Sequence, residues 1–143
     1  FVPIPSHRIS ELLSTAKIDG GLSVANKFTY GIPRIITVPE PISILPLVTY
    51  AKNTDLKIYG WLNLINYEVT HNSSLVVVES RLKEIEVNIV SFSFDFAELK
   101  FVASGRADLS IGFPVTAEPL LKGDELGTSG IKAFLPPYEV YTV

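Results

Sequence analysis

The sequence predicts a mainly β protein of the α+β class, with a single helix near its N-terminus. Apolar and polar residues alternate over residues 85–96, with one slip near Val90 and Ser91. This two-residue period is typical of a strand with one buried side and one solvent-facing side. Helical spacing occurs only after Ser6, where the apolar residues at i, i+3, i+4 and i+7 are Ile9, Leu12, Leu13 and Ala16.

One domain is expected over residues 1–143, because a chain of this length can bury a core without disulfides or a metal. Its parts are an entry segment with the helix (1–21), a proline-rich extended segment (22–50) and an antiparallel β region (51–143). The net charge of −3 and the scattered 12 lysines and arginines argue against a nucleic-acid partner. The apolar runs are shorter than the roughly 20 residues of a membrane helix, so no membrane span is expected.

Three features of the sequence bear on its compartment. There is no cysteine, so disulfide usage gives no information. The chain contains no methionine and starts at Phe1, which is expected for a mature chain cut from a precursor and equally for a trimmed chain. Asn72-Ser73-Ser74 is an N-glycosylation sequon between two apolar runs. Together these features favour a secreted protein that is glycosylated at Asn72.

The helix is expected to begin at Ser6, acting as an N-cap, and to end at Asp19-Gly20-Gly21. Four prolines between residues 33 and 46 then exclude a helix and a central strand. They leave an extended segment with strand pieces at Ile35–Val38 and Leu47–Ala51. The apolar residues of this segment need cover from the body of the fold or from a partner.

From residue 55 onward the pattern predicts strands. The long alternating strand carries Phe92, Phe94 and Phe96 on one face, and this bulky apolar wall either fills a sandwich core or lines a cavity for a hydrophobic ligand. The other expected strands are a hairpin over 56–70 and 75–79, a bent strand or two short strands over 101–113, and two strands over 131–135 and 138–143 separated by two prolines.

Residues suited to catalysis are sparse. There is no Gly-x-Ser-x-Gly turn, and of the two histidines His7 lies in the helix and His71 lies at the sequon turn, where a solvated side chain is expected. His7 and Glu11 stand four residues apart, but a third metal ligand is missing nearby. Acidic pairs such as Asp95 and Glu98 are not selected by any spacing. We therefore expect no enzyme, no metal site and no cofactor.

The residues that carry a resemblance to a known family are, in order, Leu56-Lys-Ile-Tyr-Gly60, Tyr67-Glu-Val69, the alternating residues 85–96, Leu99-Lys-Phe-Val-Ala-Ser-Gly105, Pro119-Leu-Leu-Lys-Gly123 and Gly127. In this order they resemble the takeout and juvenile-hormone-binding proteins of insect haemolymph, with the mite group 7 allergens of the same tubular lipid-binding superfamily. The resemblance implies a strongly curved antiparallel sheet packed on the N-terminal helix. That family usually has an N-terminal cysteine pair and a long C-terminal helix, both missing here, so a further helix or a second chain is expected to complete the sheet.

The leading hypothesis is a secreted, non-enzymatic carrier that holds a terpenoid, fatty acid or carotenoid in an apolar cavity. A second polypeptide chain or a homo-oligomer is an expected partner. The alternative is a structural or assembly module, for example a β-sandwich subunit of a capsid or of the extracellular matrix. The predicted ligand-binding residues, each of which could equally belong to a dry core, are Phe92, Phe94, Phe96, Ile85, Val87, Ile89, Phe101, Trp61 and Leu64.

Overall fold

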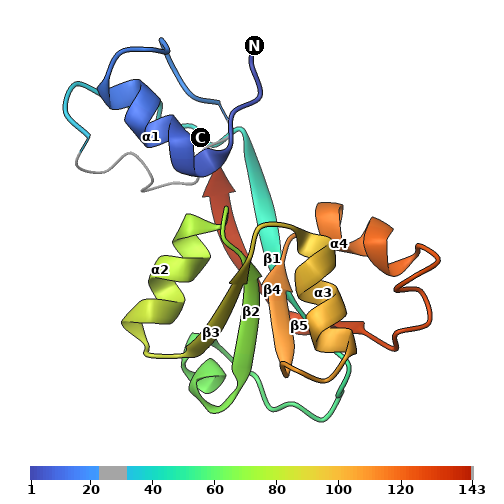
Figure 1. The fold of residues 1–143 in the computed structure, drawn as a ribbon. Helices are drawn as coiled ribbons and strands as arrows, with labels where there is room; N and C mark the ends of the chain where they lie inside the picture. Colours follow the sequence, from blue (N-terminus) through green and yellow to red (C-terminus); the bar gives the residue numbers. More distant parts are fainter. Residues whose placement is uncertain (23–31, 143) are drawn as a thin grey trace. The chain divides into compact units, whose positions relative to one another are not determined.

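The computed structural model of the chain describes residues 1–22 and 32–142 (Figure 1). The chain divides into two compact units, and each is described by itself. The N-terminal unit comprises Phe1–Leu45 and Glu139–Val143, and the sheet unit comprises Pro46–Tyr138. Both boundaries fall within strands, namely β1 (Ser43–Ala51) and β5 (Lys132–Thr142).

The N-terminal unit begins with the predicted amphipathic helix, α1 (Ser6–Ser14). Ile9 and Leu13 are its buried residues, four positions apart, as a single apolar stripe requires. Ser6 is the first helical residue rather than the N-cap, and no side chain caps the helix start. The helix stops before the predicted glycine pair because Ala16 adopts a left-handed backbone with φ of 52°.

The proline-rich segment that follows contains turns and extended backbone in its described part. Residues 32–42 form neither a helix nor a strand, so the strand piece predicted at Ile35–Val38 is absent. Ile36 is 91% exposed and Val38 is 64% exposed. The piece predicted at Leu47–Ala51 forms as the buried half of β1. Residues 23–31 of the predicted segment lie outside the described residues.

The sheet contains five strands in the order β3-β2-β4-β1-β5. β2 pairs in parallel with both β3 and β4, whereas β1 is antiparallel to β4. The residue pairs Thr70↔Ser110 and Tyr50↔Ser110 place these three side chains on the same face. β2 (Glu68–Asn72) and β4 (Leu109–Gly112) are interior strands, and β3 (Asn88–Phe92) is an outer strand of this sheet.

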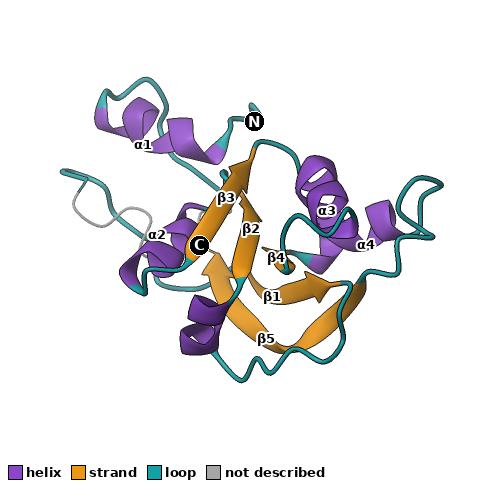
Figure 2. Ribbon diagram, turned by 60° about the horizontal axis from the view of Figure 1, so that its bottom comes forward, coloured by secondary structure: helices purple, strands orange, loops and turns teal. Residues whose placement is uncertain are grey.

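Helices alternate with the parallel strands. The 3₁₀ helix η1 (Trp61–Asn66) precedes β2, α2 (Val76–Glu84) joins β2 to β3, α3 (Asp95–Ala103) joins β3 to β4, and α4 (Pro114–Leu121) follows β4. α2 lies on one side of the sheet, whereas α3 and α4 lie on the other (Figure 2). Parallel strands need such crossover helices, which also cover the two sheet faces.

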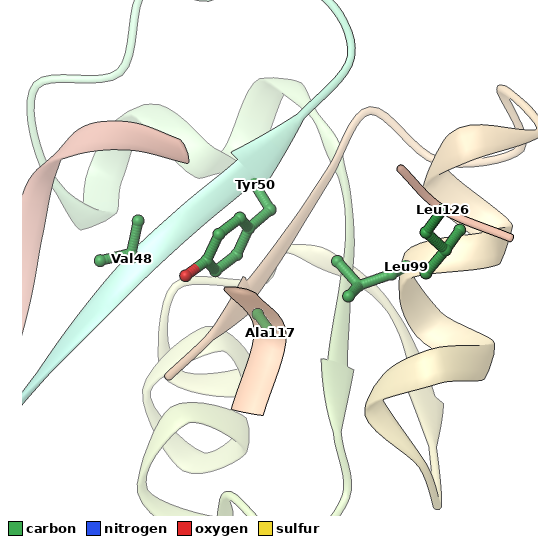
Figure 3. Packing of buried hydrophobic residues seen from close by; sticks show 5 residues of the cluster. All are labelled: Val48, Tyr50, Leu99, Ala117 and Leu126. Atoms are coloured by element: carbon green, nitrogen blue, oxygen red, sulfur yellow. The ribbon is translucent and has the colours of Figure 1, made fainter. Parts of the chain in front are cut away.

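One buried cluster lies on the sheet face under α3 and α4. Tyr50 of β1 is fully buried there, and Leu99 of α3 is 1% exposed (Figure 3). The opposite face is closed by α2, whose buried residues Val78 and Leu82 stand one turn apart. The complete buried cluster on the α3 side comprises Val48, Tyr50, Leu99, Ala117 and Leu126.

The predicted long strand over residues 85–96 is wrong in extent. Ile85 and Glu86 form the turn after α2, and Glu86 has a positive φ of 56°. Only Asn88–Phe92 is a strand, because α3 starts at Asp95. The Phe92-Phe94-Phe96 wall is therefore divided between a strand end, a loop and a helix.

The prediction of an antiparallel β region with a single helix in the chain is also wrong. The mixed α+β fold is confirmed. The strong curvature of the sheet is not confirmed. The valines at 76–78 favoured a strand by intrinsic preference, but burial of Val78 and Leu82 on one face makes the segment helical. The 101–113 stretch is the end of α3, a turn with Gly105 at φ 73°, and β4. β5 continues through Pro136-Pro137 as an outer strand of the described sheet, and proline within sheets is found mainly in such strands.

Candidate functional site

The carboxyl ends of the three parallel strands define one edge of the sheet. β2, β3 and β4 end at Asn72, Phe92 and Gly112, and a helix starts after each of them. The chain leaves β2 towards β3 on one side and returns from β3 to β4 on the other side of β2. In open α/β sheets, ligands bind at such a reversal of strand order, outside the carboxyl ends of the strands. This carboxyl edge is the candidate site.

Side chains and backbone join the first two loops of the carboxyl edge. The Asn72 amide nitrogen donates to Asp95 Oδ1 at 2.8 Å, and the Asn72 amide oxygen accepts from the backbone N–H of Ser74 at 2.9 Å. The backbone N–H of Ser73 donates to the carbonyl of Phe92 at 2.7 Å. The loop after β2 is thus fixed against the loop after β3, and a ligand would meet a preformed surface.

The N-terminus of α2 gives this edge its hydrogen-bond donors. The backbone N–H groups of the first turn of an α-helix have no partner within the helix and carry a partial positive charge. In α2 these groups begin at Val76, directly after the fixed loop, and the side chain of Ser73 is exposed beside them. Such an arrangement suits an anionic group such as a carboxylate.

A carboxyl group is buried beneath the same edge. Glu98 of α3 is 2% exposed, and its Oε1 accepts a hydrogen bond from the hydroxyl of Ser110. Burial raises the pKa of Glu98 to about 8; the Ser110 bond lowers that pKa, and the charge of Asp95 raises it. Glu98 is therefore largely protonated at neutral pH.

A second buried polar group lies on the opposite sheet face. His71 is fully buried; its Nδ1 lies 2.9 Å from the carbonyl of Asn72, and its Nε2 lies 2.9 Å from the hydroxyl of Ser91. Burial lowers the pKa of His71 below its ordinary value, an effect partly opposed by the Asn72 carbonyl and Glu79. The prediction that His71 is a solvated loop residue is wrong, because His71 lies inside β2 rather than in the turn after it.

The structure distributes the predicted ligand-binding residues over several elements. Phe92 and Phe101 are brought together, with ring centroids 5.2 Å apart. Phe96 packs against the buried cluster under α3, whereas Phe94 is 74% exposed between β3 and α3.

The remaining predicted lining residues lie in β3, in the turn before it and in η1. Val87 is buried after α2, with Ile85 and Ile89 half-buried on either side of it. Leu64 is fully buried in η1, where Trp61 is half-buried. A ligand-binding role for these residues stays a prediction.

Glycosylation of Asn72 also stays a prediction, and a glycan would be attached to the same nitrogen that donates to Asp95. Among residues 1–22 and 32–142 there is no group of three histidine or acidic side chains arranged to hold a metal ion. In the same residues, no helix combines the length and apolar character needed to cross a membrane.

Comparison with known sequences gives a distant relative. No family model matches the chain. An uncharacterized protein of Shewanella oneidensis strain MR-1 is 25% identical over 146 residues. The match covers 96% of this chain and 54% of the relative, so the chain spans about half of the relative's length.

Several solved structures share the fold. A histidine kinase sensor domain with similarity to periplasmic binding proteins matches at a TM-score of 0.67 and 16% identity, over 97% of this chain and 61% of that chain. An ancestral arginine-binding protein bound to arginine matches at a TM-score of 0.65 and 18% identity, over 99% of this chain and 65% of that chain. The substrate binding protein of an amino acid ABC transporter matches at a TM-score of 0.65 and 15% identity, over 99% of this chain and 62% of that chain. In each case the chain spans less than two thirds of the solved structure.

These comparisons overturn the resemblance to the takeout and juvenile-hormone-binding family. The resemblance rested on the order of the quoted stretches and implied an antiparallel sheet. In the structure residues 85–96 contain the parallel strand β3, whereas residues 99–103 belong to α3 and residues 119–121 to α4. The lipid-binding and insect-haemolymph assignments that came with it are wrong. The chain instead shares its fold with these solved binding proteins and with the sensor domain.

Proposed function

We propose that the chain is a non-enzymatic binding domain for a small solute with amino-acid chemistry. The observation that carries this proposal is the fold likeness over 99% of the chain to proteins described as binding arginine or as serving an amino acid ABC transporter. A third likeness is to the sensor domain of a histidine kinase, which is described by its similarity to periplasmic binding proteins.

The carboxyl edge supports the same proposal independently of sequence likeness. The first-turn N–H groups of α2 and the exposed hydroxyl of Ser73 offer donors to a carboxylate, which every free amino acid carries. The hydrogen bonds from Asn72 to Asp95 and from Ser73 to Phe92 hold these donors in place. A preformed donor set costs less conformational entropy when the ligand binds.

Secretion and assembly belong to the proposal rather than to the findings. One similar protein is a sensor domain described by its similarity to periplasmic binding proteins, which supports an extracytoplasmic location for this chain. A second polypeptide chain or a homo-oligomer stays a prediction. Asn72, Ser73 and Asp95 place hydrogen-bonding groups at the carboxyl edge, so we propose a polar solute.

Isothermal titration calorimetry with the set of free amino acids tests the proposal. At least one amino acid should bind, and its carboxamide analogue should bind more weakly because the carboxylate is lost. Ser73→Asp places a negative charge beside the α2 N-terminus and should weaken binding about tenfold, since like charges separated by a few ångströms repel by roughly 1–2 kcal/mol in partly solvated sites.

Ser104→Asp is the matched control. Ser104 is an exposed serine at the opposite end of α3, so the same charge is added away from the carboxyl edge. It should leave the affinity unchanged. Equal weakening by both variants, or heat of binding from none of the amino acids, would refute the proposal.

A further inference from the structure

We propose that Ser91 is an activated nucleophile, with His71 as its general base, on the sheet face covered by α2. The site lies on the sheet face opposite to Glu98. The proposal does not depend on the proposed solute binding. The sequence alone predicts no catalytic residue, because it contains no Gly-x-Ser-x-Gly turn and because His71 is expected to be solvated.

The geometry of the pair is that of a nucleophile and its base. Asn72 offers a carbonyl, which can only accept, so Nδ1 of His71 must carry the proton in the 2.9 Å contact. In the neutral ring Nε2 is then the acceptor, and the Ser91 hydroxyl donates to it at 2.9 Å. A base oriented by a third group is the arrangement that activates serine hydroxyls in proteins.

A reactive pair requires a base held in place and an accessible nucleophile, and His71 and Ser91 meet these two requirements. His71 is fully buried, so its orientation is held, whereas Ser91 is exposed and open to a reagent. Glu79 and Lys83 of α2 are the charged groups that act on the imidazole, and they form an ion pair with each other. Their opposite charges largely offset one another at His71.

The edge position of β3 adds a hydrogen-bond donor. β3 is an outer strand of the described sheet, and the carbonyl of Phe92 accepts from Ser73 on the β2 side. Successive residues of a parallel ladder direct their backbone groups to alternate sides, so the N–H of Ser91 faces away from β2. This N–H is free of the ladder and can donate to an oxygen that becomes negative during attack.

The chemical class that fits is an acyl or phosphoryl electrophile. With a fluorophosphonate, the bond between Ser91 Oγ and phosphorus forms, the P–F bond breaks and fluoride leaves. The hydroxyl proton passes to Nε2 of His71 and then to water. With an ester, the Oγ–acyl bond forms, the bond to the alkoxide breaks, and the leaving alkoxide takes the proton from His71. The product is an acyl-serine, which is a covalent modification of the binding domain and not a catalytic turnover.

Labelling with a fluorophosphonate probe, followed by intact-protein and peptide mass spectrometry, tests the proposal. One adduct is expected, at Ser91, and Ser91→Ala should abolish it. Ser93→Ala removes an exposed serine two positions further along the chain and should leave labelling unchanged. His71→Gln should slow labelling about a hundredfold, since a general base contributes roughly that factor.

The pH dependence of the native chain keeps the test decisive if His71→Gln does not fold. Because the pKa of His71 is lowered, labelling should reach a plateau near neutral pH and decline only as the pH falls below 6.5. A rate that rises tenfold per pH unit without a plateau would indicate attack by an unassisted hydroxyl. That profile, an adduct at Ser93 instead, or no adduct at Ser91 would overturn the proposal.

Discussion

His71 and Glu98 are two buried titratable residues on opposite faces of one sheet, and each is hydrogen-bonded to a serine. Burial moves both pKa values towards the neutral form: that of His71 downwards and that of Glu98 upwards to about 8. They differ in how fully the neutral form is satisfied. Both nitrogens of His71 have partners, whereas Oε2 of Glu98 has no hydrogen-bond partner among the described residues.

This comparison shows that similar burial has different consequences for the two side chains. The imidazole has one donor and one acceptor, and the parallel pair β2–β3 supplies a carbonyl and a hydroxyl in the right places. The carboxyl group meets only the hydroxyl of Ser110, so its ionised form would be poorly solvated. We expect Glu98 to reduce stability at alkaline pH and His71 to reduce it at acid pH.

The largest effect is expected for Glu98→Gln. In the unfolded chain the carboxyl ionises near its ordinary pKa of 4.5, whereas in the folded chain it ionises only near 8. The folded state therefore binds this proton more tightly, and stability falls as the pH rises from 4.5 through 8. Glu98→Gln should remove this fall and exceed the native chain by roughly 2–4 kcal/mol at pH 8.5.

Urea unfolding monitored by circular dichroism between pH 5 and 8.5 measures this difference. Asp95→Asn serves as the control, because it removes the neighbouring charge and keeps the buried carboxyl. A Glu98→Gln variant whose stability decreases with pH as steeply as that of the native chain would contradict the assignment.

A smaller effect of the opposite sign is expected for His71→Gln. Since the folded pKa is lowered, the stability that His71 contributes is present above pH 6.5 and is lost as the pH falls through the folded pKa. The variant should lose about 1–2 kcal/mol near pH 7.5, where its hydrogen bonds are replaced imperfectly. Its acid limb should be flatter in the same urea series, and an acid limb as steep as in the native chain would rule out this role.

The smallest effects are expected at the two serines. Ser110 is fully buried, so Ser110→Ala leaves Oε1 of Glu98 without its donor and should cost about 1 kcal/mol at pH 7. Ser91 is exposed, so water can replace its hydroxyl at His71, and Ser91→Ala should cost less than about 0.5 kcal/mol. Thermal unfolding of the two variants ranks them, and a larger loss at Ser91 would reverse the comparison.

The sequence was informative where one residue pattern has one structural solution. The helix after Ser6 forms because its apolar stripe fits no other period, and Leu47–Ala51 forms a strand as its β-branched and aromatic residues suggest. The stretch 85–96 has two solutions. Residues 88–92, which include the slip at Val90 and Ser91, form β3. Phe94 and Phe96 belong to a loop and a helix start whose position depends on packing against Tyr50 and its neighbours.

α2 shows which pattern was available and overlooked. Glu79 lies near its start and Lys83 near its end, in the order that the helix dipole favours, and they form an i,i+4 ion pair. These charges were outweighed by the valines at 76–78, whose intrinsic preference is for strands. Reading them as a helix start would have turned the predicted hairpin into a parallel β-α-β unit and placed Ser73 at a helix N-terminus.

By itself, the sequence determined the mixed content of helices and strands, the first helix and the low charge of this protein, because composition and local periodicity act over a few neighbouring residues. Only the tertiary structure decided the parallel order of the strands, the carboxyl edge and the pairing of His71 with Ser91. Those features join residues about 20 or more positions apart, and they depend on which sheet face each helix covers, which no local pattern encodes.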